Sequence, residues 1–236
     1  MGKESKIILA ADELSLKQCG ELLPKIGSRL HAVKIHNLYD QHGPNVVARL
    51  LSDGAKKVWV DAKLHDIPNT AKLRANAIEK SGAEILTVHA SGEIEMMMAA
   101  IEAFGGYDVL AITALTSLNE EQIHLLHGQP SKAAVLYLAR LAKLAGCTGV
   151  VCSPKEVGML AKRPELKGLK FIVPGVRSVG QASGDQQRVD TPIAAIKAGA
   201  DYLVVGRQLT NAEDPIEALD KLEEEINQEL SVKVAP

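Results

Sequence analysis

The sequence predicts an α/β protein folded as a single-domain (β/α)8 barrel, and three observations lead to that prediction. Short runs of β-branched and aliphatic residues recur along all 236 residues. Segments with helical periodicity separate these runs, so strand and helix alternate. Polar residues follow many of the runs instead of only one or two, which is typical of a barrel mouth built from many strand ends.

The strand-like runs are apolar at nearly every position, as strands buried on both faces of a parallel sheet are. They lie at residues 6–11, 31–36, 56–63, 83–89, 107–113, 148–153, 170–175 and 201–206.

The segments between the runs are expected to be helical. Proline occupies the first turn of several of them, where its missing N–H removes no hydrogen bond. Gly82, Gly146 and Gly199 stand between a helix and a strand, where a left-handed C-terminal cap is expected. The connection over residues 113–148 is longer than the others and has room for an extra helical turn before Ser131. The expected helices span residues 16–26, 44–51, 69–80, 94–104, 133–144, 154–160, 192–198 and 215–230.

Units of about 30 residues fill the chain, so we expect one catalytic barrel domain over residues 1–236. A doubly wound open sheet shares the alternation and is the alternative fold. Its ligand groups would gather at one switch point, whereas here they follow strands along the whole chain. The residues concerned are Asp12, Lys34, Asp61, Lys63, Thr116, Arg177 and Arg207.

The composition excludes several classes of protein. Lys and Arg (27) nearly balance Asp and Glu (29), which leaves no basic field to attract DNA or RNA. The uncharged apolar runs fall short of the roughly 18 residues that span a bilayer. No secretory signal precedes the first strand, so we expect a cytoplasmic protein without a membrane partner. Cys19, Cys147 and Cys152 form no CxxC pattern, and we expect no disulfide.

The segment VWVDAKLHDIPNTA, residues 58–71, is the most informative in the chain. Asp61 and Lys63 are two residues apart at the end of a strand, so both side chains leave the same face, toward the barrel axis. Asp66 follows on the loop. A lysine between two aspartates stays protonated, because nearby negative charge favours the ammonium form. Such a lysine acts as an acid, whereas a Schiff base needs a neutral amine.

Structural roles are the alternative for these charged residues. Asp66 is equally well placed to be the N-cap of the helix that starts near Pro68. A structural role explains Asp61 and Lys63 less well, because an inward-facing charged pair at a barrel mouth requires partners and usually has a function.

The string DAKLHDIPNT resembles the signature DxKxxDIPNT of the orotidine 5'-phosphate decarboxylase family, and the resemblance extends over essentially the whole chain. Related decarboxylases and aldolases of sugar phosphates share the DxKxxD core but lack the following IPNT. Ala11, Ala62 and Val173 depart from the family pattern, and these minor departures concern packing of the substrate pocket and not the reaction. Other family motifs follow in order: VK at 33–34, VHA at 88–90, LTS at 115–117, VVCS at 150–153, PGVR at 174–177, DQQR at 185–188 and VVGR at 204–207.

The resemblance implies conversion of orotidine 5'-monophosphate to UMP and CO2 without a cofactor, the last step of de novo pyrimidine synthesis. Lys63 would donate the proton to C6, with Asp61 and Asp66 flanking the leaving carboxylate. Lys34 would complete a row of alternating charges that keeps Lys63 oriented. The residues that the family sends across a two-fold interface correspond to Asp66, Ile67 and Thr70, which implies a homodimer with shared active sites.

The resemblance also implies the groups that bind substrate. Asp12 corresponds to the ligand of the ribose hydroxyls, and Thr116 and Ser117 to those of the pyrimidine edge. We expect the phosphate between the last two loops of the barrel, where the backbone at Gly206 and the guanidinium of Arg207 can meet one dianion.

A second set of phosphate ligands, Arg177 and Gln186, is expected on the preceding loop, and Pro174 is expected to bind substrate at the end of the strand before it. Residues 177–188 contain Gly180 and Gly184 and show no periodicity, as in a lid that closes over a ligand. An ordinary surface loop is the alternative.

The sequence does not predict a metal site. It contains no HExxH string or Cys/His cluster, and His124 and His127 lack a third ligand. His89, in the VHA motif, is the one histidine placed to line the pocket.

Two other functions are alternatives to this decarboxylation. A Mg²⁺-dependent lyase of a sugar phosphate is disfavoured by the IPNT and VK motifs. A catalytically silent nucleotide-binding scaffold is disfavoured by the intact set of Asp61, Lys63 and Asp66.

Overall fold

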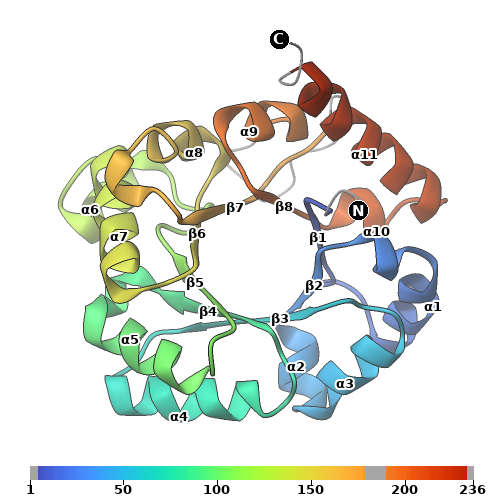
Figure 1. The fold of residues 1–236 in the computed structure, drawn as a ribbon, viewed down its shortest axis with the longest axis horizontal. Coiled ribbons are helices and arrows are strands. Elements are labelled where there is room, and N and C mark those ends of the chain that lie inside the picture. Colours follow the sequence, from blue (N-terminus) through green and yellow to red (C-terminus); the bar gives the residue numbers. More distant parts are fainter. Residues whose placement is uncertain (1–4, 179–189, 233–236) are drawn as a thin grey trace.

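A computed structural model of the protein describes residues 5–178 and 190–232, and its strands close into a parallel barrel (Figure 1). Each strand pairs with the next, and β8 returns to β1, where Ile7 pairs with Leu203. The barrel prediction is therefore confirmed and the open sheet was the wrong alternative. The strands are β1 Ile7–Ala10, β2 Ala32–Ile35, β3 Val58–Leu64, β4 Ile85–His89, β5 Asp108–Ile112, β6 Gly149–Val151, β7 Lys170–Pro174 and β8 Tyr202–Val205.

The helices surround the barrel, and those predicted from the sequence begin and end within two residues of the expected positions. The short helices α2 and α10 were not predicted, and α6 is longer than the single turn expected before Ser131. The helices are α1 Leu16–Ile26, α2 Asn37–His42, α3 Asn45–Ser52, α4 Pro68–Glu79, α5 Glu93–Ala103, α6 Glu120–His127, α7 Ser131–Ala145, α8 Pro154–Leu160, α9 Pro192–Ala198, α10 Arg207–Thr210 and α11 Pro215–Val232.

Local sequence signals explain where several helices begin and end. Ser15 and Gln18 form a reciprocal capping box at the start of α1, which satisfies two backbone donors that the first turn leaves open. Gly146 and Gly199 end α7 and α9 in the left-handed conformation, with φ of 90° and 114°. A residue with a Cβ would be strained there.

Two apolar cores result from the alternation of side chains along the strands. Residues that point outward pack against the helices, and residues that point inward fill the barrel. The inward core consists of Ile8, Ala32, Trp59, Ile85, Leu110, Ile112, Val151, Ile172 and Val204. Inward side chains that lie nearer to the strand ends than this core therefore rest on an apolar surface.

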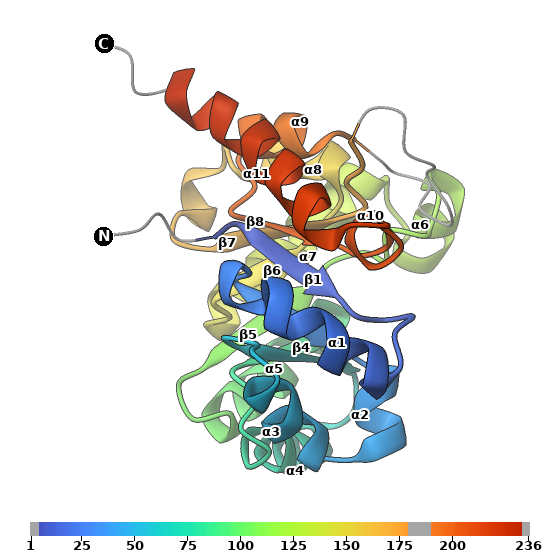
Figure 2. The same cartoon turned by 90° about the vertical axis from the view of Figure 1, so that its right-hand side faces the viewer.

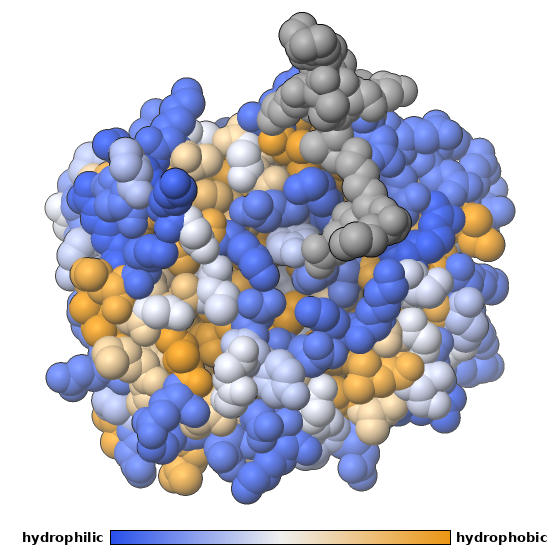
Figure 3. Space-filling model, viewed as in Figure 1, coloured by the Kyte–Doolittle hydropathy of each residue, from blue (hydrophilic) through white to orange (hydrophobic). Residues whose placement is uncertain are grey.

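The two ends of the barrel differ in what covers them. Helices α2, α6 and α10, which follow strand ends, lie on the same side of the molecule (Figure 2). Figure 3 views the opposite end, where the strands begin, and hydrophilic residues surround the centre of that face.

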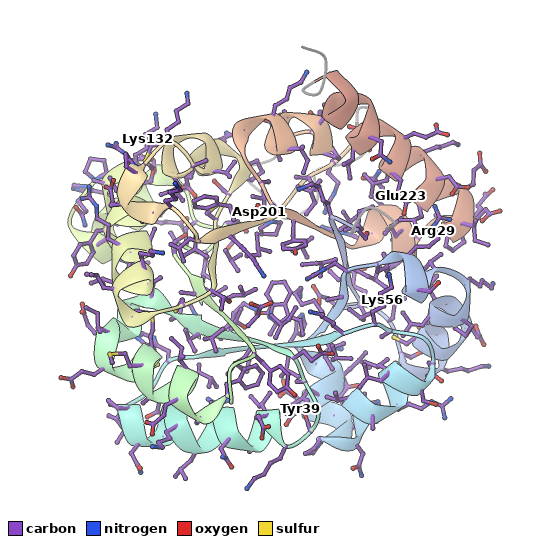
Figure 4. All side chains as sticks on the ribbon, in the orientation of Figure 1. Arg29, Tyr39, Lys56, Lys132, Asp201 and Glu223 are labelled. Atoms are coloured by element: carbon purple, nitrogen blue, oxygen red, sulfur yellow. The ribbon has the colours of Figure 1, made fainter. Side chains whose placement is uncertain are left out.

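The first and last helical segments of the chain meet next to the pairing of β8 with β1. Arg29, in a 3-10 turn over Gly27–Arg29, lies beside Glu223 of α11 (Figure 4). One guanidinium nitrogen, Nη2, lies 2.7 Å from Glu223 Oε2 and 2.6 Å from Asp220 Oδ1.

The remaining general expectations concern cysteines and membranes. All three cysteines are buried and free. In the part of the chain that the structure describes, no helix has both the length and the apolar character needed to cross a bilayer.

Candidate active site

A cavity of about 370 Å³ opens at the end of the barrel where the strands finish. Its apolar wall continues the inward core through Trp59, Ile112, Val151 and Val204. The polar groups come from several strand ends, as the sequence predicts. They are Asp12, Glu13, Lys34, His36, Asp61, Lys63, Thr116, Arg177, Arg207 and Thr210.

Four of the predicted residues form a row of alternating charge. Lys34 Nζ donates to Asp12 Oδ1 at 2.6 Å and lies 3.2 Å from Asp61 Oδ2. Lys63 Nζ donates to the same Asp61 oxygen at 2.6 Å. Lys34 and Asp61 are nearly buried, with side chains 8% and 7% exposed, whereas Lys63 is 36% exposed and lines the cavity. Both lysines line the cavity, and Lys63 is the more exposed of the two.

The environment keeps both carboxyl groups of this row ionised. Burial alone would raise the pKa of Asp61, but the charges of Lys34 and Lys63 and the hydrogen bonds from Lys63 and Thr87 outweigh it and hold that pKa below its usual value. For Asp12, burial is likewise outweighed by hydrogen bonding to His36 and by Lys34, which lower its pKa to about 2.

An irregularity in β3 carries the two central residues. Val60 pairs with Leu86 of β4, but the next pair is Leu64 with Val88, so β3 contains two extra residues. Because the number is even, alternation is kept and Asp61 and Lys63 both face inward, as predicted. Lys63 has a φ of 44°, which a residue with a side chain adopts only at a cost.

The Thr87 hydroxyl makes two hydrogen bonds to β3 where the regular pairing of β3 with β4 is interrupted. It accepts a hydrogen bond from the backbone N–H of Lys63 at 3.2 Å and donates one to Asp61 Oδ1 at 2.7 Å. Thr87 was not predicted from the sequence, although its alternation with Ile85 on an apolar strand places it on the inward face.

The residues predicted to reach across a two-fold interface do not line the cavity of their own chain, namely Asp66, Ile67 and Thr70. Asp66 is exposed, and its Oδ1 accepts a hydrogen bond from the Ile67 N–H at 2.8 Å. The N-cap of α4 is Ile67, without a side-chain cap, so the reading of Asp66 as the N-cap was wrong. Ile67 is 66% exposed.

The predicted phosphate end of the cavity lies on the loops after β7 and β8. Pro174, Arg177, Gly206 and Arg207 all line the cavity. Arg207 Nε lies 4.0 Å from Glu13 Oε1. Gln186 and most of the predicted lid are outside the described residues.

Of the two residues after β5 that were predicted to bind the pyrimidine, only one lines the cavity. Thr116 lines the cavity, whereas Ser117 is exposed and does not. His89 does not line it either: its ring lies 5.3 Å from that of His65, and burial, followed by the charges of His65 and Lys63, lowers its pKa.

The three departures from the family pattern do not reach the cavity. Ala11 and Val173 are fully buried in the core between strands and helices, and Ala62 packs against that core. None of the three residues belongs to the lining of the cavity.

His36 is a further cavity residue that the sequence did not single out. Its Nδ1 accepts a hydrogen bond from the Asn37 N–H at 2.6 Å, so the ring proton resides on Nε2. Nε2 lies 3.2 Å from Asp12 Oδ1 and extends the row by one donor.

The fold and this site together define a class of protein. A cavity at the barrel mouth, with an apolar wall, an ammonium held by a buried carboxylate and two arginines among its lining residues, is the arrangement of a (β/α)8-barrel enzyme.

The chain belongs to the Orotidine 5'-phosphate decarboxylase / HUMPS family, which it matches over residues 5–222. It is 47% identical over 183 residues to the orotidine 5'-phosphate decarboxylase of Anaeromyxobacter dehalogenans, covering 77% of this chain and 80% of that protein. It is 39% identical over 229 residues to that of Saccharophagus degradans, covering 94% and 95%. The crystal structure of the enzyme from Lactobacillus acidophilus aligns with a TM-score of 0.77 and 32% identity, over 94% of this chain and 99% of that one.

Proposed function

We propose that the chain carries out the reaction of its family, the decarboxylation of orotidine 5'-monophosphate to UMP and CO2, in the cavity at the barrel mouth. The observation that carries this proposal is the row of Asp12, Lys34, Asp61 and Lys63, which ends at an ammonium group facing the cavity. The proposal places one catalytic domain over residues 1–236, with no cofactor and in the cytoplasm, which suits the free buried cysteines.

Lys63 is assigned as the proton donor. When the bond between C6 and the carboxyl carbon breaks, CO2 leaves and the electron pair stays on C6. The Lys63 ammonium transfers one proton to that carbon, which gives UMP and a neutral amine that is reprotonated from water. The reaction needs about 20 kcal/mol of catalysis, and preset electrostatics are the largest source of such stabilisation. The buried Asp61 carboxylate supplies them by holding the ammonium in place before the reaction.

The other cavity residues are assigned to binding. Asp12 receives the ribose hydroxyls, and Thr116 contacts the pyrimidine. Arg207 and Arg177 bind the phosphate with charge-assisted hydrogen bonds. Although the phosphate is remote from C6, its binding energy contributes to catalysis by fixing the reacting ring against Lys63.

A spectrophotometric assay tests the proposed reaction. Purified protein with excess EDTA should consume orotidine 5'-monophosphate, seen as its ultraviolet absorbance change, and release UMP. A Mg²⁺-dependent lyase would lose activity in EDTA and regain it with Mg²⁺. A silent scaffold would bind UMP without any turnover.

A homodimer with shared active sites forms the second part of the proposal. Asp66, Ile67 and Thr70 do not line their own cavity, which leaves them available to complete a partner's cavity. Ile67, Leu73 and Met98 are 66%, 64% and 53% exposed, and α4 and α5 pack side by side, so this flank offers apolar side chains to a second copy.

Mixing two inactive variants tests the sharing of sites. Lys63→Ala and Asp66→Ala should each be inactive alone. A refolded equimolar mixture should recover about a quarter of the wild-type activity, because half of the dimers are hybrids with one intact site. A mixture that stays inactive, or an active Asp66→Ala variant, would contradict shared sites.

A further inference from the structure

We infer that Thr87 is a positioning residue for this reaction, because its hydroxyl fixes both the Asp61 carboxylate and the backbone of Lys63. The inference rests on the proton-donor role proposed for Lys63 and adds the group that holds the donor in place.

These two contacts use the hydroxyl both as a donor and as an acceptor. Thr87 is completely buried in β4 and faces inward, next to β3. A hydroxyl carries one proton, and the 2.7 Å contact to Asp61 Oδ1 takes it, since an ionised carboxylate only accepts. The oxygen is then left to accept the Lys63 N–H at 3.2 Å. One atom therefore joins the two residues of the predicted catalytic pair.

The backbone of Lys63 needs such a partner because the strand pairing is interrupted there. Between the Val60 to Leu86 and Leu64 to Val88 pairs, the extra residues of β3 have no regular ladder partner on β4. A buried N–H without an acceptor is costly, and a positive φ at a lysine adds to that cost. The Thr87 oxygen supplies the acceptor that the neighbouring strand's backbone does not.

The two oxygens of the Asp61 carboxylate have different partners. Oδ2 faces both ammonium groups, at 2.6 Å from Lys63 Nζ and 3.2 Å from Lys34 Nζ. Oδ1 receives the Thr87 hydroxyl. Removing that donor leaves a buried anionic oxygen unsatisfied and frees the carboxylate to rotate, which would displace Oδ2 from Lys63. Thr87 does not line the cavity, so the loss should reach the substrate only through Asp61 and Lys63.

Removing the hydroxyl while keeping the side-chain shape tests this role. Thr87→Val should lower kcat about tenfold to a hundredfold, the usual value of a hydrogen bond to a charged group. The KM for orotidine 5'-monophosphate and the Kd for UMP should change less than about threefold. The acidic limb of the kcat profile should shift to higher pH, because Asp61 loses a donor to its ionised form. Thr87→Ser should restore kcat and the pH profile.

A neighbouring threonine provides a matched control. Thr113 is also buried, and its hydroxyl donates to the Val151 carbonyl at 2.9 Å without touching Asp61 or Lys63. Thr113→Val should therefore leave kcat and the pH profile unchanged. If Thr87→Val does not fold, Thr87→Ala removes the same hydroxyl and carries the same expectation.

The outcomes separate this inference from the proposed function. Wild-type protein that does not decarboxylate orotidine 5'-monophosphate would remove the proposed function itself. Active wild-type protein with an unchanged kcat and pH profile in Thr87→Val would overturn only the role of Thr87. Equal losses of kcat and UMP affinity, or an equal loss in Thr113→Val, would show that Thr87 is merely structural and would also overturn it.

Discussion

The two ends of the barrel carry the same kinds of charged side chains in different arrangements. Where the strands begin, Lys170 Nζ lies 3.5 Å from Asp108 Oδ2 and Lys57 Nζ lies 3.9 Å from Glu84 Oε2. These four side chains are 21–43% exposed and pair one to one. At the mouth, the Asp61 carboxylate lies within 3.2 Å of two ammonium groups and is only 7% exposed.

The difference lies in the carboxylate at the centre of the row, because Asp61 is buried and shared by two ammonium groups, whereas Lys63 and Asp12 are each 36% exposed, as the partners of the structural pairs are. Partly exposed one-to-one pairs are screened by water and contribute about 0–1 kcal/mol to stability. A buried carboxylate between two cations interacts more strongly but costs free energy to bury, so it is weak evidence of stability and good evidence of function. The predictions below test that distinction.

The largest effect is expected for Lys63→Ala. Proton transfer by a positioned group contributes roughly 10²–10⁴-fold to a rate, and this variant also loses the cation that faces the developing charge. Turnover should therefore be abolished, while the Kd for UMP, measured by calorimetry, stays largely unchanged. Near-normal turnover would remove Lys63 as the proton donor.

A smaller effect is expected for Arg207→Ala at the opposite side of the same cavity. Loss of a charge-assisted contact with the phosphate should cost roughly 2–4 kcal/mol in kcat/KM, obtained from initial rates. The loss should disappear when a substrate analogue without phosphate is compared in both proteins. An unchanged kcat/KM would mean that the phosphate lies elsewhere.

Asp12 should make the free energy of unfolding of the protein depend on pH. Its pKa falls from 3.8 to about 2 on folding, so its stabilising contribution is present above pH 3.8 and is lost as the pH falls through 2. Because the side chain is 36% exposed, we expect only about 1 kcal/mol. Urea unfolding of wild type and Asp12→Asn should show a difference that shrinks between pH 4 and pH 2. A difference independent of pH would contradict the assignment.

The smallest effect is expected at the other end of the barrel. Lys170→Ala removes an exposed partner of Asp108, so the free energy of unfolding should fall by no more than about 1 kcal/mol. Its kcat should equal that of the wild type in the assay that shows Lys63→Ala to be inactive. A large loss of kcat here would break the distinction between the two ends.

Most of the fold could be predicted because its signals are local. Residues 16–26, 154–160 and 192–198 were predicted with the bounds that the structure shows, since caps, prolines and glycines mark their ends. The helices α2 and α10 were missed because six and four residues are too few to show a helical period.

The site could be predicted where it depends on a residue's position at the end of a strand or in a family motif. Asp61 and Lys63 face the cavity because alternation places them there, whereas the part played by Thr87 depends on how β3 pairs with β4. Asp66 lies three residues from Lys63 in the sequence, yet the loop turns it outward. The contact between His36 and Asp12 joins segments 24 residues apart, which periodicity does not reveal.

A crystal structure of the protein with UMP bound would test the central claim most directly. We expect the Lys63 ammonium nitrogen about 3–3.5 Å from C6 of the pyrimidine, with the phosphate against Arg207. A pyrimidine bound with C6 turned away from Lys63, or an amine directed into solvent, would contradict the account.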